Sequence, residues 1–298
     1  MEKKFRVCAV VVCYYPNMEE FPLNIDSIAS QVDQLLIVDN SEIPLKMDFI
    51  NGKEYQDKIE FILLGENKGI GAAQNIGIQK AIDLGFDGVL LLDQDSNPPQ
   101  NLVEELSRGF QYLNSLEIKV ACLGPEIYNK ESEAVYTPLL NKGVSLTTDF
   151  VEKDAIISSG KLLISDAVQQ IGLMDETLFI DLVDFEWCWR ARKFGYRVFT
   201  NKKARMGHMV GQKNKKLFNV YNLLIPSPIR HYYQFRNSLL LLRKGYVPKY
   251  WKVRVLIERT IDLFVYPFFI NPKRIRFKYI RKGIMDGVLG RKGKIAND

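Results

Sequence analysis

Cysteine, histidine and long apolar runs are all scarce in this 298-residue chain. The four cysteines form no CxxC pair and only two histidines are present, which argues against a disulfide scaffold or a zinc ribbon and favours reduced intracellular thiols. No apolar run reaches the roughly 18–20 residues of a membrane-spanning helix, since the best stretch, 261–270, is short and contains Asp262. Residues 7–13 lead into Tyr14-Tyr15-Pro16 without a small-residue cleavage site, so we expect a first strand there and not a signal peptide.

The composition favours a folded protein with an uneven charge distribution. Apolar residues make up 47% and charged residues 26%, which excludes global disorder, and the length allows one large α/β domain or a domain with an appendage. Residues 230–298 hold 17 of the 41 Lys and Arg but 4 of the 35 Asp and Glu, a net charge of +13, whereas the remainder carries −7. A basic tail of this kind suits an anionic surface, either a membrane leaflet or nucleic acid.

Short apolar runs alternate with helical patterns through the first two thirds of the chain. This alternation predicts a mostly parallel sheet covered by helices, because strands buried on both faces read as continuous apolar runs. The expected strands are 6–13, 34–38, 58–64, 88–92, 120–124, 156–164 and 197–200. The expected helices are 21–30, 72–83, 102–116, 166–171 and 184–194. The polar stretch 126–155 is expected to form a loop or a small hairpin.

The character of the chain changes at residue 226, where we place a boundary between regions 1–225 and 226–298. Residues 232–242 are apolar and helical in pattern. A second helical stripe follows, with Pro267 and Pro272 expected to break it and a basic, aromatic segment at 273–278 after it. The apolar positions of this stripe are Val253, Leu256, Ile257, Ile261, Phe264 and Phe268.

Asp93-Gln94-Asp95, at the end of an apolar strand, is the sharpest chemical motif. Ligands of open α/β sheets bind at the carboxyl ends of strands. Two carboxylates one residue apart can share a divalent cation with phosphate oxygens, and hard oxygen ligands fit Mg²⁺ or Mn²⁺. The alternative is a turn with solvated acids.

A second acidic cluster lies between residues 179 and 190, where acids stand beside large apolar side chains. Such surroundings can shift the pKa of a carboxyl group towards the value that a general base needs. The alternative is that Asp184 caps a helix and that Glu186 lies on the surface. The residues of interest here are Asp181, Asp184, Glu186, Trp187 and Arg190.

Three further features could contribute to a ligand site. His208, flanked by glycines, could supply a nitrogen ligand to the cation, whereas His231 fits helix packing better. The Gly-rich segment 67–75 opens a helix, which suits an approaching nucleotide, although it fails as a dinucleotide fingerprint because Gln74 stands where the third glycine belongs. Asp39 ends the second strand and could accept from a nucleobase or ribose, or simply form a turn.

In this order, the motifs resemble those of the inverting family 2 glycosyltransferases of GT-A fold, over roughly residues 7–211. The matching segments are 10–16, 37–41, 67–77, 93–95, 183–190 and His208. Segments 93–96 and 183–188 most resemble bacterial rhamnosyltransferases of polysaccharide assembly. Two residues depart from the family pattern at the base pocket: Cys13 replaces the usual Thr and Gln74 the usual Arg.

The resemblance implies a role for each matching residue. Asp184 would be the catalytic base, and Asp95 and His208 would hold Mg²⁺ or Mn²⁺ on the donor diphosphate. Asp93 would contact the ribose and the metal region. The remaining nucleotide-sugar contacts would be Tyr14, Asp39, Asn67 and Gln74, and the residues that support the acceptor side would be Asp181, Glu186, Trp187 and Arg190.

The resemblance also implies substrates and a location. The favoured donor is dTDP-β-L-rhamnose, with a UDP-sugar as the alternative, and the acceptor would be a lipid-linked saccharide at the cytoplasmic leaflet. We therefore expect a cytoplasmic enzyme that associates peripherally with anionic membrane through residues 232–294. The alternative for this region is a helical subdomain that packs on the catalytic core or on a second copy of the chain.

Other functions fit the sequence less well. A phosphatase of the haloacid dehalogenase type also has D-x-D, but on its first strand and with Thr or Val where this chain has Asn97. A nucleic-acid-binding protein is supported only by the basic tail, whose aromatics follow a helical stripe rather than a stacking platform. A sugar-nucleotide binder without turnover would leave both acidic clusters unnecessary.

Overall fold

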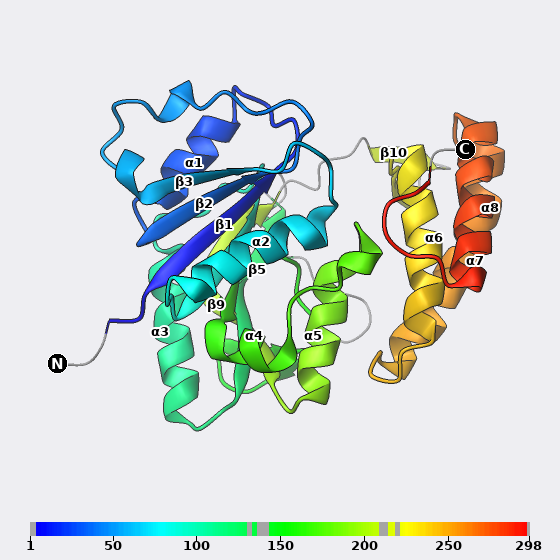
Figure 1. Ribbon diagram of the computed structural model, residues 1–298. Coiled ribbons are helices and arrows are strands. Elements are labelled where there is room, and N and C mark those ends of the chain that lie inside the picture. The colour runs from blue at the N-terminus through cyan, green and yellow to red at the C-terminus, as the bar shows by residue number, and fades with distance from the viewer. Residues whose placement is uncertain (1–3, 130–132, 136–142, 209–213, 218–220, 297–298) are drawn as a thin grey trace.

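The computed structural model describes residues 4–129, 133–135, 143–208, 214–217 and 221–296. Its centre is a nine-stranded sheet in the order β3-β2-β1-β4-β8-β5-β9-β7-β6, flanked by helices (Figure 1). The strands of this sheet are β1 (Val7–Cys13), β2 (Gln34–Asp39), β3 (Ile59–Leu63), β4 (Gly88–Asp93), β5 (Val120–Asn129), β6 (Val144–Ser145), β7 (Phe150–Lys153), β8 (Lys161–Ile164) and β9 (Arg197–His208). A separate hairpin pairs β10 (Asn214–Leu217) with β11 (Tyr221–Leu224).

The helices lie on the faces of the sheet and beside it, with the last three grouped at one side (Figure 1). They are α1 (Phe21–Ala29), α2 (Ile70–Asp83), α3 (Leu102–Ser115), α4 (Ser165–Ile171), α5 (Val183–Lys193), α6 (Pro228–Leu242), α7 (Lys249–Phe269) and α8 (Lys273–Leu289). Among the described residues, no helix is both long and apolar enough to cross a membrane.

The N-terminal half of the sheet is parallel throughout, as the alternating pattern predicts. Strands β3, β2, β1 and β4 pair in parallel, and all seven residues of β1 are buried. The rest of the sheet is mixed, because β8 inserts between β4 and β5 and runs antiparallel to both. A mostly parallel sheet is therefore the right description of the first four strands and not of the whole.

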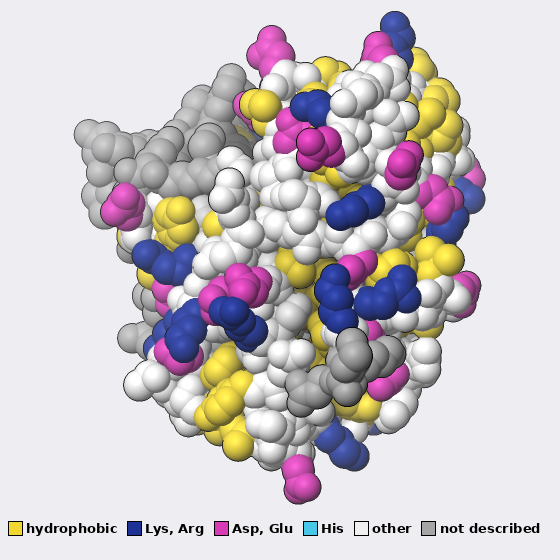
Figure 2. All heavy atoms as spheres, turned by 90° about the vertical axis from the view of Figure 1, so that its left-hand side faces the viewer, with side chains coloured by type: hydrophobic (Ala, Val, Ile, Leu, Met, Phe, Trp, Pro, Cys, Tyr) yellow, Lys and Arg dark blue, Asp and Glu magenta, His cyan; other side chains and the backbone are white. Residues whose placement is uncertain are grey.

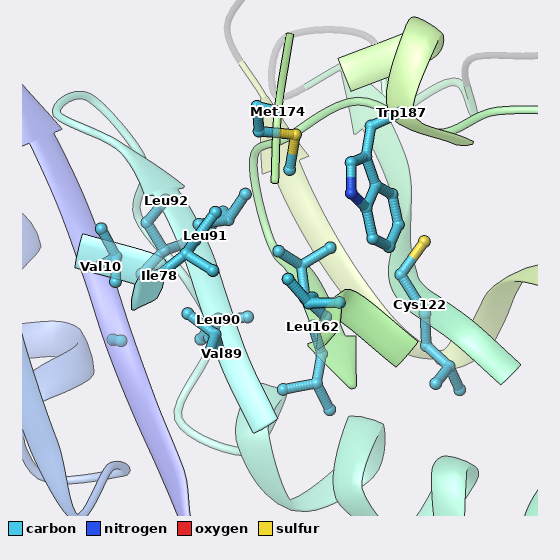
Figure 3. Packing of buried hydrophobic residues seen from close by; sticks show 14 of the residues in the cluster. Val10, Ile78, Val89, Leu90, Leu91, Leu92, Cys122, Leu162, Met174 and Trp187 are labelled. Atoms are coloured by element: carbon cyan, nitrogen blue, oxygen red, sulfur yellow. The ribbon is translucent and has the colours of Figure 1, made fainter. Parts of the chain in front are cut away.

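The core lies between these strands and the helices that cover them. Figure 3 shows Val10, Ile78 and Leu90 packed together from β1, α2 and β4, with Leu162 of β8 and Trp187 of α5 beyond them. Burying such side chains stabilises the fold by about 1.5–3 kcal/mol each. The continuous apolar runs of β1 and β4 are explained by this two-sided cover.

The structure differs from the expected elements mainly in the middle of the chain. The stretch 126–155, expected to form a loop or a small hairpin, contains the β6–β7 hairpin and, in addition, the end of β5. The stretch 156–164 is a strand only from Lys161 onward.

Pro267 does not break α7 but lies in its last turn. There, the missing N–H and the ring disturb little of the remaining helix. Pro272 instead precedes the first residue of α8.

Helices α6 and α8 pack closely side by side. A Cβ at Gly283 of α8 would lie 2.5 Å from the Tyr232 carbonyl oxygen of α6, so only glycine allows this approach. His231, expected to serve packing, is fully buried here, and its Nε2 lies 2.7 Å from Arg276 of α8. Burial lowers the pKa of His231 to about 3, with the nearby Arg276 charge acting in the same direction.

The face that looks away from these C-terminal helices carries both signs of charge. On its described surface, Lys and Arg side chains are interspersed with Asp and Glu (Figure 2). The excess positive charge of the sequence lies instead in residues 230–298, which form α6, α7, α8 and the segment after them.

Candidate active site

The carboxyl ends of β1, β2 and β4 meet at one edge of the sheet. The register pairs Cys13 with Asp39 and Val12 with Asp93. Asp93, the last residue of β4, therefore lies at this edge, and the Asp93–Ser96 turn begins there. The exposed Asp95 lies at the tip of the turn.

Gln94 connects this turn to the turn after β1. Its side-chain Oε1 accepts the Tyr14 N–H at 2.7 Å, and its carbonyl accepts from the Asn24 amide at 3.1 Å. Behind it, the hydroxyls of Ser96 and Ser159 lie 2.7 Å apart, which joins the turn to the residues before β8. The middle residue of the D-x-D motif therefore orients the two carboxylates around it.

Asp39 is buried at the end of β2 and organises the turn that follows. Its two carboxylate oxygens accept the backbone N–H groups of Ser41 at 3.0 Å and Leu45 at 2.7 Å. The Cys13 thiol donates to the same carboxylate over 3.8 Å. The exposed Tyr14 and Tyr15 lie just beyond, with the Tyr15 N–H bound to the Ser41 hydroxyl at 2.9 Å.

The Gly-rich segment opens α2, as expected, near the same edge. Asn67 accepts from the Gly69 N–H at 3.0 Å and from the Asn40 side chain at 3.2 Å. Gly69 has φ +88° and a Cβ there would collide with Phe179, so glycine is required. Gln74 is buried, and its Oε1 is a polar acceptor without a partner among the described residues.

Asp184 is the second residue of α5, where the helix dipole favours negative charge. Leu182 occupies the N-cap position, so Asp184 does not cap the helix as the alternative interpretation held. One Asp184 oxygen accepts the Phe185 N–H at 2.9 Å. Burial raises the pKa of Asp184, although the Lys161 charge and backbone donors oppose this shift.

The two acidic clusters come together in space. Burial raises the pKa of Asp93 to about 7, and the negative charges of Asp95 and Asp184 act in the same direction. Asp184 is about ninety residues away in sequence yet close enough to influence Asp93. Asp95 and Asp184 are therefore both near enough to Asp93 for their charges to affect its ionisation.

Lys161 is a functional candidate that the sequence analysis missed. It is the first residue of β8, opposite Leu91 of β4, and it is fully buried. Its Nζ donates to the Asp184 carbonyl over 3.4 Å. Burial alone would lower the pKa of Lys161, but the neighbouring Cys188 and Asp184 raise it, so the ammonium stays charged beneath the carboxylates. The sequence feature that could have pointed to Lys161 is a lysine at the start of an apolar strand.

The loop before α5 is strained and is held by α6. Phe179, Asp181 and Leu182 have φ of 64°, 64° and 66°, a conformation that costs about 1–3 kcal/mol for each such residue. The buried Asn237 side chain donates to three carbonyls of the loop, at Leu178 (3.0 Å), Ile180 (2.7 Å) and Asp181 (3.1 Å). Residues beyond position 225 therefore fix the backbone that leads into Asp184.

Arg236 and Arg230 add to this attachment. Arg236 is buried and donates to the Leu178 carbonyl at 2.9 Å. Arg230 forms an ion pair with Asp181. These contacts cross the expected boundary between residues 225 and 226.

Glu186, Trp187 and Arg190 point into the protein. Glu186 is buried, not on the surface, and forms a bidentate pair with Arg190 at 2.8 and 3.0 Å. Tyr246 donates to Glu186 at 2.5 Å, and the Trp187 indole donates to the Gly172 carbonyl at 2.8 Å. Their hydrogen-bond partners are all groups of the protein itself, so these bonds fix the position of α5, which carries Asp184.

Two carboxylates at the end of β4, those of Asp93 and Asp95, offer oxygens of the kind that a hard divalent cation prefers. Asp95 is exposed and offers carboxylate oxygens beside Asp93, and the mutual repulsion that raises the pKa of Asp93 would be relieved by a cation. Within the described ranges, however, no group of three His, Cys, Asp or Glu side chains is arranged to hold a metal. His208 ends β9, opposite Asn129, and its side chain lies outside the described residues.

Comparison with known proteins identifies the chain. Over 297 residues it is 31% identical to the dTDP-rhamnosyl transferase RfbF of Shigella flexneri, covering 95% of this chain and 96% of that protein. The chain belongs to the family 2 glycosyltransferases of GT-A fold. The glycosyltransferase is also 26% identical over 198 residues to the low-salt glycan biosynthesis hexosyltransferase Agl10 of Haloferax volcanii, covering 62% of this chain and 61% of Agl10. No family model matches the sequence.

Solved structures support the same fold. The glycosyltransferase superposes on GalNAc-T7 with UDP, GalNAc and Mn²⁺ with a TM-score of 0.60 and 14% identity, covering 96% of this chain and 58% of that one. It superposes on residues 1–349 of S. aureus TarS in complex with UDP-GlcNAc with a TM-score of 0.53 and 12% identity, covering 96% and 92%. At this identity the likeness concerns the fold alone.

Proposed function

We propose that this glycosyltransferase transfers L-rhamnose from dTDP-β-L-rhamnose to a lipid-linked saccharide acceptor in the biosynthesis of a cell-surface polysaccharide. The observation that supports it most directly is that the charges of Asp95 and Asp184, in addition to burial, raise the pKa of Asp93 at the end of β4. The match to a dTDP-rhamnosyl transferase along nearly the whole chain supports the choice of donor. A UDP-sugar donor is the second candidate, because TarS, which shares the fold, is known in complex with UDP-GlcNAc.

In this proposal Asp184 is the general base. Its carboxylate accepts the proton of the acceptor hydroxyl as that oxygen attacks the anomeric carbon, and the bond to the nucleoside diphosphate breaks on the opposite face. One such displacement inverts the anomeric centre, so a β-L-rhamnosyl donor gives an α-L-rhamnoside. A raised pKa suits this role, since a stronger base takes the proton more readily; such a base contributes about 10²- to 10⁴-fold in rate.

The donor would occupy the edge formed by β1, β2 and β4. The exposed ring of Tyr14 and the turn at Asp39 would border the nucleobase, with Asn67 at the start of α2 close by. Gln74 Oε1, which has no hydrogen-bond partner in the part of the chain that the structure describes, suits a base that offers an N–H donor, as thymine and uracil do. Asp93 would contact the ribose.

Asp95, with Asp93 beside it, would hold Mg²⁺ or Mn²⁺ against the donor diphosphate, and His208 would be a further ligand. Bound there, the cation would supply charge stabilisation for the leaving diphosphate. The residues around it would keep the carboxylates ionised and oriented, through Gln94 on one side and Lys161 beneath.

Residues 226–298 would attach the enzyme to anionic membrane. The apolar stripe of α7 is exposed, with exposed fractions of 51–61% for its members Val253, Leu256, Ile257, Ile261, Phe264 and Phe268. Burial of this stripe in the interface would add to the attraction of the basic residues, which contribute about 1 kcal/mol each near an anionic surface. Flotation with anionic liposomes, weakened by added salt, is the expected result.

The test is a panel of nucleotide sugars with and without Mg²⁺ or Mn²⁺. We expect dTDP-β-L-rhamnose to raise the melting temperature in a cation-dependent manner, and to be hydrolysed slowly when water takes the acceptor's place. Stabilisation by UDP-sugars alone would favour the second candidate. No stabilisation by any nucleotide sugar would contradict the proposal.

A further inference from the structure

The docking segment, residues 291–296, follows α8 and turns back along α6 (Figure 1). It is fixed there by hydrogen bonds to the loop before α5 and to α6. The Gly293 N–H donates to the Thr177 carbonyl at 2.8 Å, and the buried Arg236 of α6 donates to the Gly293 carbonyl. The segment is therefore attached to the same loop that leads into the proposed base.

Apolar contacts extend this attachment to the start of α2. Ile295 packs against the cluster of Phe179, Tyr232 and Tyr233, in which the Phe179 and Tyr233 rings stack with centroids 5.0 Å apart. The Phe179 carbonyl in turn accepts the N–H of Ile70, the first residue of α2, at 2.7 Å. The docking segment, the loop before α5 and the start of α2 are therefore connected through these aromatic rings.

Lys294 extends from the docking segment to the proposed donor edge. Its Nζ donates to the backbone carbonyl of Asn67 at 3.2 Å, although the two residues are 227 positions apart in sequence. This bond uses one of the three N–H donors of the ammonium group. Lys294 is exposed, so the group is also accessible to a molecule that arrives from solvent. Asn67 is one of the residues that the proposed function assigns to the nucleotide sugar.

The charges near this edge leave a role for an added cation. Burial and the negative charge of Asp95 raise the pKa of Asp93, so the edge disfavours a further anion. Lys68, next to Asn67, lies 3.5 Å from the Glu66 carboxylate, which offsets its charge. A nucleotide sugar with a neutral hexose carries its negative charge on the diphosphate, and lysine binds phosphate as a point charge.

We propose that Lys294 is a donor-binding residue, placed by the docking segment, that binds the diphosphate of the nucleotide sugar. The inference rests on the proposed function for the place of the donor. It gives the part of the chain after α8 a role in donor binding, in addition to the proposed attachment to a membrane.

Binding of thymidine and dTDP, measured by ligand-observed NMR in membrane-free buffer with Mg²⁺, tests this assignment. Lys294→Met should weaken dTDP binding about tenfold, the usual size of a lost charge-assisted hydrogen bond. Thymidine binding should stay the same, because thymidine has no phosphate. Lys294→Arg, which keeps the charge, should bind dTDP nearly as the wild type does. A purely structural bond to Asn67 would instead affect thymidine and dTDP equally.

A second variant tests whether the docking segment places Lys294. Ile295→Asn should detach the segment from the aromatic cluster and weaken dTDP binding about as much as Lys294→Met. The double variant should bind dTDP no more weakly than either single variant, since both changes remove the same contact.

Lys292→Met is the matched control, because it removes another exposed charge of the same segment. It should bind dTDP as the wild type does. The melting temperatures of the Lys292 and Lys294 variants should equal that of the wild type, which confirms folding.

Three results would overturn the inference: dTDP binding unchanged in Lys294→Met, equal losses in Lys294→Met and Lys292→Met, or equal losses for thymidine and dTDP. Failure of the proposed function is read separately, as absence of dTDP-rhamnose hydrolysis by the wild type. Binding of UDP in place of dTDP, weakened by Lys294→Met, would refute the donor and support the role of Lys294. A wild type that bound neither nucleotide would overturn both.

Discussion

The two loops that carry the candidate catalytic carboxylates are held in different ways. The Asp93–Ser96 turn continues a buried parallel strand and is fixed by its sheet neighbours and by local hydrogen bonds. The loop before Asp184 contains three residues with positive φ and is held by Asn237 and Arg236, more than fifty residues farther along the chain. The first loop follows from local sequence, and the second depends on tertiary contacts.

This difference changes what the C-terminal region is expected to do. A region that only attached the enzyme to a membrane could be altered without affecting the chemistry. Because α6 holds the backbone that leads into Asp184, we expect alterations there to reduce turnover even with soluble substrates.

The largest effect is expected from Asn237→Ala. The carbonyls of Ile180 and Asp181 would lose the Asn237 donor, that of Leu178 would keep Arg236, and the strained loop would lose its anchor, with a loss of about 3 kcal/mol in unfolding free energy. Displacement of Asp184 should reduce kcat about 10²-fold. Chemical denaturation and donor hydrolysis measure the two quantities.

The matched control is Asn24→Ala, which removes a single donor to the Gln94 carbonyl beside the other loop. We expect a loss of about 1 kcal/mol and little change in kcat. Equal losses of turnover in the two variants would show that the loops do not differ in the way described.

Asp93→Asn should stabilise the protein while inactivating it. A carboxyl with a pKa of about 7 in the folded state and an ordinary pKa in the unfolded state binds more protons when folded, so it lowers stability as pH rises from about 4 to 7. The neutral amide removes this cost. In EDTA at pH 8 we expect about 3 kcal/mol of added stability, shrinking as the pH falls towards 4. Equal stabilisation at pH 4 and pH 8 would contradict the account.

Lys161→Met should shift the pH dependence of activity. The Lys161 ammonium lowers the pKa of Asp184, whereas burial raises it. Removal of the ammonium should therefore raise the pKa of Asp184 further, and the acid limb of the pH profile of kcat should move to higher pH. Asp93, Cys122 and Cys188 also interact with Lys161, and none of them supplies a positive charge. Lys161→Arg, which keeps the charge, should retain the wild-type limb. An unchanged limb in Lys161→Met would assign Lys161 a purely structural role.

The sequence predicts the first half of the fold well, because continuous apolar runs ending in polar turns describe parallel strands locally. It also predicts that Asp93, Asp95 and Asp184 belong to one site, although only through the resemblance and not through spacing. It does not predict the mixed half of the sheet, since the insertion of β8 between β4 and β5 depends on which distant strands pair.

The supporting residues escaped prediction for the same reason. Lys161 matters because β8 lies beside β4, and Asn237 matters because α6 lies against the loop before α5. In each case the sequence shows a polar residue inside an apolar strand or helix pattern. This pattern does not indicate which residues the side chain will contact. The expected roles of Tyr14, Asp39, Asn67, Gln74 and His208 remain predictions.

Asp184→Asn tests the central claim most directly. The measurement is the rate of sugar transfer or donor hydrolysis together with the Kd for dTDP-rhamnose, on protein whose melting temperature is unchanged. We predict a rate lower by about 10²- to 10⁴-fold with a Kd within a few fold of the wild type. Donor binding lost as completely as activity would show that Asp184 holds the donor and is not the base.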